Sequence, residues 1–264
     1  MAIHASAQIH ATAHVEDGAK IGANCRIGPF CLIGADVTLH DGVEVKSHAV
    51  ITGMTEIGEG TQVFPFVTLG EVPQDLKFKG EKTKLLIGAR NRIREHVTMN
   101  IGTDGGGGVT RIGDDGLFMA GAHVAHDCQI GDRVILVNNA ALAGHCVLED
   151  DVIIGGLSGV HQFVRIGRGA MIGAVTMVTA DVIPFGLVQG PRGQLDGLNL
   201  VGLKRRGADR ASIAALRELF DALGEGNFRE SARAQASINA ENTHVREVLD
   251  FVLGPSDRSF LTPR

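Results

Sequence analysis

The stretch Lys20-Ile-Gly-Ala-Asn-Cys-Arg-Ile-Gly-Pro-Phe-Cys-Leu-Ile-Gly34 places an isoleucine followed by a glycine at every sixth position. An apolar residue keeps this spacing through most of the chain, from Ile3 to Leu69, from Ile87 to Met99 and from Ile112 to Val178. A helix buries a residue every 3.6 positions and an ordinary strand every second one, so a period of six fits neither. It predicts a solenoid in which three short strands and their turns close one triangular coil.

Such a coil turns sequence spacing into distance. Residues 18 apart should lie directly above one another, about 4.8 Å apart, which is the spacing of neighbouring strands. The glycine that often follows the apolar residue is expected at a tight corner with positive φ.

The period also divides the chain. We expect a parallel β-helix over residues 1–184, interrupted by inserted loops at about 70–86 and 101–111. The second loop carries Gly105-Gly106-Gly107-Gly108, which fits either a flexible tip or a cover over a site. Residues 185–264 should form a glycine-rich connector followed, from about residue 199, by a small helical domain, because apolar residues there recur at helical spacing.

Composition and charge exclude several classes of protein. The net charge of −5 argues against a nucleic-acid binder, and no apolar run is long enough to cross a membrane. The first residues enter the hexad pattern without a signal peptide, and four scattered Cys suit a reducing compartment, so we expect a cytoplasmic protein. Apolar residues outside the axial positions, such as Ile135, Ile153 and Met177, indicate a face buried in a threefold homo-oligomer.

Polar residues gather in the later coils, and the 18-residue rule brings them together in space. His126, Gly144 and Gln162 share one column, and Asp127 and His145 share the next. His123 and His161 lie close by in sequence. Groups that are distant in sequence and near in space have the geometry of an active site.

Three functions of this cluster stay open from the residues alone. His126 could take a proton near neutral pH, Asp127 could orient its ring, and the Gly144 N–H could stabilise an oxyanion. The histidines could instead only fill a face between subunits. They could also bind zinc, as three histidines do between the subunits of γ-class carbonic anhydrases.

A second charged motif is Gly202-Leu-Lys-Arg-Arg-Gly207, at the entry to the helical part. Adjacent arginines with a lysine can clamp a phosphate, although such a motif also occurs in solvated turns. Local basic patches on an acidic chain suggest an anionic ligand or an acidic partner.

Seven motifs together resemble those of the UDP-N-acetylglucosamine O-acyltransferases of lipid A synthesis. They run in order along nearly the whole chain: Ile27-Gly-Pro-Phe-Cys, Gly70-Glu-Val-Pro-Gln-Asp-Leu-Lys, Arg90-Asn-Arg-Ile-Arg-Glu, His123-Val-Ala-His-Asp-Cys, Asn138-Asn-Ala-Ala-Leu-Ala-Gly-His, Val160-His-Gln-Phe and Gly202-Leu-Lys-Arg-Arg-Gly. The resemblance implies a left-handed β-helix, a homotrimer and active sites between subunits. It also implies transfer of a 3-hydroxyacyl chain from acyl carrier protein, held on its phosphopantetheine arm, to the 3-hydroxyl of UDP-N-acetylglucosamine.

The resemblance also implies a role for each matching residue. His126 would be the general base, oriented by Asp127, and Gly144 would supply the oxyanion N–H. The residues that would contact the sugar nucleotide or the acyl chain are Asp75, Lys77, His123, His145, His161, Gln162, Asn199, Arg205 and Arg206. No metal and no further cofactor are expected, because the thioester is already activated.

The chain departs from the family's pattern at two positions. Val201 stands where the family has Glu, so one contact to the nucleotide is in question. Ala174 occupies the position that measures acyl length, where Gly accepts a long chain and Met a short one. Acyl length, and a hydroxyl or an amine as acceptor on the sugar, therefore stay open; a 3-amino analogue of the sugar nucleotide is an alternative substrate.

Overall fold

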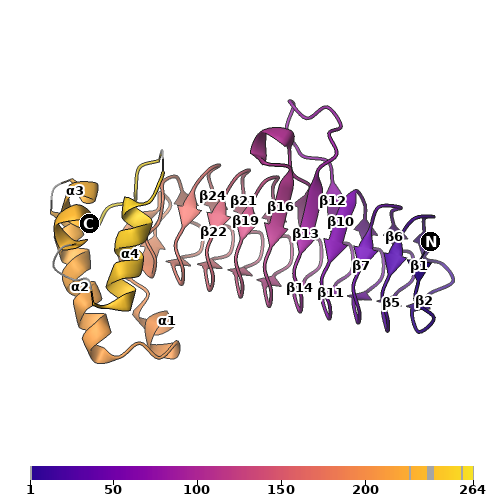
Figure 1. Cartoon of the computed structure of the whole chain (residues 1–264), viewed down its shortest axis with the longest axis horizontal. Helices are drawn as coiled ribbons and strands as arrows, with labels where there is room; N and C mark the ends of the chain where they lie inside the picture. Colours follow the sequence, from indigo (N-terminus) through magenta and orange to yellow (C-terminus); the bar gives the residue numbers. More distant parts are fainter. Residues whose placement is uncertain (1, 226, 237–240, 257, 264) are drawn as a thin grey trace.

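The computed structural model describes the chain except for residues 1, 226, 237–240, 257 and 264. Its strands wind into a left-handed parallel β-helix, and a small group of helices follows at the C-terminal end; the hexad period predicts the β-helix and the family resemblance implies its hand. Figure 1 shows the helices closing one end of the solenoid, with the N-terminus at the other end and the inserted loops projecting from one side.

Three parallel sheets form the sides of the prism. The first contains β1 (Ala2–Ile3), β4 (Lys20–Ile21), β7 (Thr38–Leu39), β10 (Met54–Ile57), β13 (Lys84–Ile87), β16 (Val109–Ile112), β19 (Gln129–Ile130), β22 (Val147–Leu148) and β25 (Arg165–Ile166). The second contains β2 (Gln8–Ile9), β5 (Arg26–Ile27), β8 (Glu44–Val45), β11 (Gln62–Val63), β14 (Arg92–Ile93), β17 (Leu117–Phe118), β20 (Ile135–Leu136), β23 (Ile153–Ile154), β26 (Met171–Ile172), β28 (Gly186–Gln189) and β29 (Gln194–Leu198). The third contains β3 (His14–Val15), β6 (Leu32–Ile33), β9 (Val50–Ile51), β12 (Thr68–Glu71), β15 (Thr98–Asn100), β18 (His123–Val124), β21 (Ala141–Leu142), β24 (Gly159–Val160) and β27 (Met177–Val178).

The register confirms the 18-residue rule wherever no loop intervenes. His123 pairs with Ala141, and Ala141 pairs with Gly159. The residues at every sixth position point to the axis, and Ile51, Val63 and Ile154 among them expose no surface. Ile3 and Ile9 are only half-buried, because no coil lies beneath the first one.

The prediction that the repeated glycines adopt positive φ is wrong for the glycine directly after the axial residue. The left-handed residue comes two positions later, as at Asn24 (φ 57) and Phe30 (φ 58), which follow Gly22 and Gly28. The glycines are needed for space instead. A Cβ on Gly22 would lie 2.8 Å from the backbone of the next coil, closer than side-chain carbons approach in proteins.

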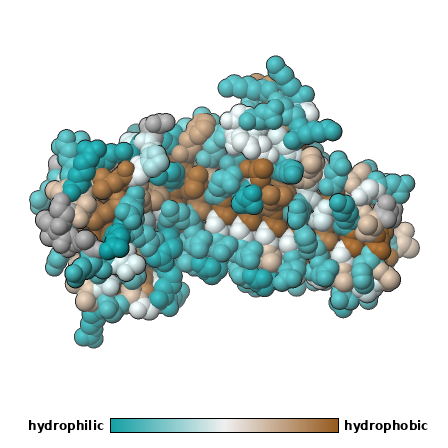
Figure 2. Space-filling model, in the orientation of Figure 1, coloured by the Kyte–Doolittle hydropathy of each residue, from teal (hydrophilic) through white to brown (hydrophobic). Residues whose placement is uncertain are grey.

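The two insertions leave the stack at the same corner, between the third sheet and the first. One joins β12 to β13 and the other joins β15 to β16, and the second contains a short 3₁₀ helix, η1 (Asp104–Gly106). Flanking strands extend into both predicted loops, so the segments outside strands are 72–83 and 101–108. Figure 2 shows the projection as mostly hydrophilic.

The segment after Pro184 is not the connector that the sequence predicts. Strand β28 pairs with β26 and continues the second sheet, and β29 returns antiparallel to β28. The hexad period ends here because β28 buries every second residue, Gly186 and Val188. Four glycines between residues 186 and 197 obscure that alternation in the sequence.

The helical part covers the open end of the solenoid. It comprises α1 (Leu200–Arg205), α2 (Arg210–Gly224), α3 (Phe228–Ala236) and α4 (Thr243–Leu253). Leu216, Leu223 and Val248 from α2 and α4 line one apolar space together with Ile183 and Leu198. In the described part of the chain, no helix is both long and apolar enough to span a bilayer.

Candidate active site

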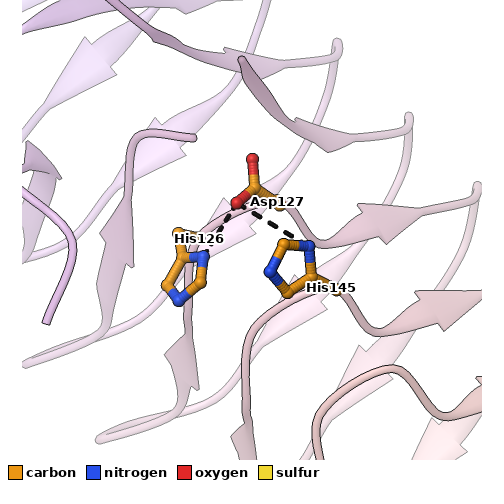
Figure 3. Close-up of side chains that lie close together, drawn as sticks. All are labelled: His126, Asp127 and His145. Carbon is orange, nitrogen blue, oxygen red and sulfur yellow. Dashed lines mark hydrogen bonds and ion pairs between the residues drawn. The ribbon is translucent and has the colours of Figure 1, made fainter. Parts of the chain in front are cut away.

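His126, Asp127 and His145 meet at the corner between the third sheet and the first (Figure 3). Asp127 and His145 occupy the same corner position in successive coils, with φ angles of 60° and 61°. His126 precedes Asp127 and lies beside Gly144, one coil on. The structure therefore brings together the residues that the 18-residue rule predicts.

The His126 ring is oriented by a short hydrogen bond. Its Nδ1 lies 2.8 Å from Oδ2 of Asp127, whose side chain is completely buried. An ionised carboxylate only accepts hydrogen bonds, so Nδ1 carries the proton. The Nε2 atom on the other side of the ring then has a free lone pair and can accept a proton.

Two threonines that sequence reasoning missed hold Asp127 in place. Thr103 donates its N–H to Oδ1 over 2.8 Å and its hydroxyl to Oδ2 over 2.6 Å. The Asp127 N–H donates in turn to the Thr110 hydroxyl over 2.8 Å. The carboxylate thus accepts three hydrogen bonds, counting the one from His126, as a buried anion requires.

His145 and His123 flank this pair as neutral rings. Burial lowers the pKa of His145, although the charges of Asp127 and Asp75 oppose that shift, and the ring stacks on Phe163 at 4.3 Å. Burial also lowers the pKa of His123, whose Nδ1 lies 2.7 Å from the Thr98 hydroxyl. Both rings can therefore offer hydrogen bonds at neutral pH without adding positive charge next to His126.

Gly144 packs against the ring of His126. A Cβ at this position would lie 2.6 Å from Cε1 and 2.7 Å from Nε2 of His126, so only glycine fits beneath the ring. Within the described part of the chain, the Gly144 N–H donates no hydrogen bond. An unused backbone donor beside a general base can stabilise a developing oxyanion.

Comparison with known proteins shows the family. Residues 181–261 match the family model described as UDP-N-acetylglucosamine O-acyltransferase, domain 2, and residues 2–35 and 19–53 match the bacterial transferase hexapeptide repeat. The chain is 81% identical over 202 residues to the acyl-[acyl-carrier-protein]–UDP-N-acetylglucosamine O-acyltransferase of Paracoccus denitrificans, which is 76% of this chain and 77% of that protein. It is 49% identical to the enzyme of the same name from Rhizobium johnstonii, over 87% of this chain and 85% of that one.

The chain belongs to the UDP-N-acetylglucosamine O-acyltransferase family. A solved structure agrees: the UDP-N-acetylglucosamine acyltransferase from Campylobacter jejuni superposes with a TM-score of 0.92 at 37% identity, over 97% of this chain and all of that one.

Other residues of the acyltransferase motif lie around the same corner. Asp75 and Lys77 lie on the first inserted loop, where the Lys77 N–H donates to Asp75 Oδ1 over 3.0 Å. His161 and Gln162 are exposed one coil beyond Gly144. Sequence reasoning missed Arg258, which reaches back from the C-terminal segment and donates to the Thr179 carbonyl, with Nη2 3.5 Å from His161.

The remaining acyltransferase motif residues lie on other edges of the protomer. Asn199 caps α1, and its Nδ2 donates to the Gly169 carbonyl, to which Arg206 also donates. Both Arg205 and Arg206 are exposed, and partial desolvation of the Arg206 guanidinium lowers its pKa. Ala174 is exposed at the corner between the second and third sheets. One protomer therefore does not bring these residues next to His126.

The zinc hypothesis has some geometric support, because ligand atoms of His126, Asp127 and His145 lie within 4.8 Å of one another. Three hydrogen bonds already engage the Asp127 carboxylate, however, and one of them uses the His126 Nδ1 that faces it. A metal between these residues would have to displace those bonds. The arrangement fits an acid–base pair better than a metal site.

Proposed function

We propose that this chain transfers a 3-hydroxyacyl group from acyl carrier protein to the glucosamine 3-hydroxyl of UDP-N-acetylglucosamine, the first step of lipid A synthesis. The observation that carries the proposal is the hydrogen bond from the partly exposed His126 to the buried Asp127, beside an unused Gly144 N–H. The identity to the Paracoccus denitrificans enzyme supports the substrates.

The proposed reaction uses His126 as a general base. Its Nε2 takes the proton of the sugar 3-hydroxyl as that oxygen attacks the thioester carbonyl carbon. The Gly144 N–H donates a hydrogen bond to the resulting oxyanion. When the intermediate collapses, the carbon–sulfur bond breaks, and the His126 proton passes to the departing thiolate of the phosphopantetheine arm. The products are the sugar ester and the free carrier thiol, so no metal or covalent enzyme intermediate is required.

The remaining residues would bind the substrates. His123, His145, His161 and Gln162 surround the pair and would contact the sugar nucleotide or the acyl chain, and Asp75 and Lys77 would hold the sugar from the first loop. Asn199, Arg205 and Arg206 would hold the nucleotide and its phosphates. Val201 is 61% exposed on α1, and we expect this apolar side chain to leave one nucleotide contact unmade.

We further propose that the site is completed in a homotrimer, because its residues lie on different edges of one protomer. Apolar side chains that a lone prism would expose support this assembly. The corner between the second and third sheets exposes Phe30 (60%), Phe66 (50%), Leu157 (66%) and Val175 (62%). Burial of such a row against a neighbouring prism would stabilise the trimer by the hydrophobic effect. The reduced, buried cysteines suit the cytoplasm as its location.

An assay of donors and acceptors tests the proposed function. The purified chain would be incubated with 3-hydroxyacyl carrier proteins of several lengths and with either UDP-N-acetylglucosamine or its 3-amino analogue, and the product identified by mass spectrometry. We expect an O-acylated sugar nucleotide from the wild type and at least a hundredfold lower rate from His126→Ala, in line with the usual contribution of a general base. No acylated product from any donor would overturn the proposal, and product only with a 3-amino sugar nucleotide would reassign the acceptor.

Acyl length gives a second test at Ala174. The methyl group should shorten a tightly fitted pocket relative to glycine, because core pockets resist an added carbon. We expect Ala174→Gly to shift the preferred donor toward longer chains and Ala174→Met toward shorter ones, as measured by kcat/KM across the donor series. An unchanged preference in both variants would show that Ala174 does not measure the chain.

A further inference from the structure

We propose that the loop of residues 101–108, between β15 and β16, is a fixed cover for the Asp127 carboxylate and that Thr103 and Gly106 are positioning residues for His126. The inference rests on the proposed function, since it assigns these residues to the orientation of the general base. Neither residue touches the substrate position; both act through Asp127.

Thr103 fixes both oxygens of the carboxylate. Its N–H donates to Oδ1 over 2.8 Å and its hydroxyl to Oδ2 over 2.6 Å, and Oδ2 also accepts from His126 Nδ1. Two donors from one residue set the plane of the carboxylate. That plane sets the direction in which His126 can bond, and hence where its Nε2 points. Hydrogen bonds to an ionised group are the stronger kind, so the loss of this hydroxyl should be costly.

The glycine run explains how a loop can lie so close to a carboxylate. A Cβ on Gly106 would lie 2.0 Å from Cγ of Asp127, so the Gly106 backbone packs directly on the carboxylate face. A Cβ on Gly102 would lie 2.8 Å from Oδ1. Gly105, in contrast, has no atom within 4 Å of its Cβ position and needs no positive φ. The glycine run is therefore more than a flexible tip. Gly106 must be glycine because it covers Asp127, whereas the space around Gly105 would accept a side chain.

The cover is tied to the solenoid. The Thr83 hydroxyl donates to the Gly102 carbonyl over 2.6 Å, and the Gly102 N–H donates to the Lys84 carbonyl over 3.1 Å. The N–H groups of Gly106 and Gly108 both donate to the Thr103 carbonyl. These bonds hold the loop over a carboxylate whose side chain is 0% exposed. Water is thereby kept from Asp127, and His126 remains its partner on the substrate side.

The kinetic test compares Thr103→Val with Thr103→Ser. Valine removes the hydroxyl at nearly constant shape, and serine keeps it. We expect Thr103→Val to lower kcat about tenfold to a hundredfold, the range for a lost hydrogen bond to a charged group, with little change in KM for the sugar nucleotide. Thr103→Ser should keep most of the wild-type kcat. Equal kcat in the valine variant and the wild type would overturn the role of Thr103.

A matched glycine pair tests the cover independently. We expect Gly106→Ala to lower kcat at least as much as Thr103→Val, because the added methyl group must displace the carboxylate or the loop. Gly105→Ala should leave kcat unchanged, because its methyl group meets open space. Equal effects of the two substitutions on kcat would overturn the cover, because the loss would then not depend on contact between residue 106 and Asp127.

Proton NMR separates failure of this inference from failure of the proposed function. The Nδ1 proton of His126, bonded to a buried carboxylate, should give a downfield resonance that His126→Gln removes. We expect Thr103→Val and Gly106→Ala to shift or broaden it, and Gly105→Ala to leave it in place. This result does not depend on which substrate the enzyme uses. An unmoved resonance in both Thr103→Val and Gly106→Ala would overturn the cover even if acyl transfer is confirmed.

Discussion

The proposed catalytic residues occupy ordinary positions of this fold. Asp127 and His145 have left-handed φ angles, but so do other corner residues, including Asn24, Arg133 and Asn139. The backbone at the site is therefore the standard corner of the solenoid and stores no strain peculiar to catalysis. What distinguishes the site is the choice of side chains at successive corners, so single substitutions that move a ring should have large effects without unfolding the chain.

Gly144→Ala is the sharpest such substitution. The new methyl group would lie 2.6 Å from Cε1 and 2.7 Å from Nε2 of His126, so the ring must tilt away. We expect kcat to fall about a hundredfold, because a displacement of about 1 Å at a reacting group costs that much. Steady-state kinetics would measure it. Gly159→Ala is the control, since its methyl group would meet Met177 Sδ at an ordinary 3.5 Å; a similar loss in both variants would contradict the argument.

Some contacts of individual site residues could be predicted from the sequence, and others could not. Regular spacing predicted that Asp127 and His145 stack and that Gly144 lies beside His126. It could not predict Thr103, because the two insertions have their own lengths and the offset between neighbouring coils there is not 18. The apolar residues Met99 and Val124, 25 apart, pair in the structure. Aligning those two residues would have predicted that Thr98 lies beside His123. Thr103 lies in an inserted loop outside the six-residue period, so its contact with Asp127 could not be predicted in this way.

At the scale of the element, strand β18 carries a histidine whose burial should make the free energy of unfolding depend on pH. His123 bonds to Thr98 on the paired strand β15, and burial lowers its pKa below the ordinary value of 6.5. Below about pH 6.5 the unfolded chain therefore binds a proton that the native chain does not. The free energy of unfolding should fall as pH decreases from that value toward the folded pKa. His145 contributes in the same direction, since its pKa is also lowered.

His123→Asn tests this coupling. We expect the urea midpoint of the wild type to decrease when the pH is lowered from about 7.5 to about 5.5. The midpoint of the variant should decrease less, because one proton-linked contribution to stability is gone. Both would be measured at one protein concentration, since assembly also affects stability. His4→Asn, an exposed residue of the first coil, serves as the control. An equal or steeper fall in His123→Asn would contradict the sign worked out here.

At the scale of the whole molecule, a prism of stacked coils has edges that cannot meet within one chain. His126 lies at the corner between the third and first sheets, whereas Arg206 bonds to Gly169 near the corner between the first and second. The helices cover the end of the solenoid and leave these edges apart. In the proposed trimer, neighbouring protomers would bring these two edges together around one substrate.

Mixed trimers test that arrangement directly. His126→Ala and Arg206→Ala would be coexpressed with different tags, and trimers carrying both tags purified. Each variant alone should be nearly inactive. If His126 and Arg206 of neighbouring protomers form one site, each trimer that carries both variants has about one intact site in three, so activity should reappear at about a third of the wild-type level. If both residues served the same site from one protomer, every site would keep a defect and the mixture would stay as inactive as its parents. Addition of the two variants after separate purification, without subunit exchange, is the control.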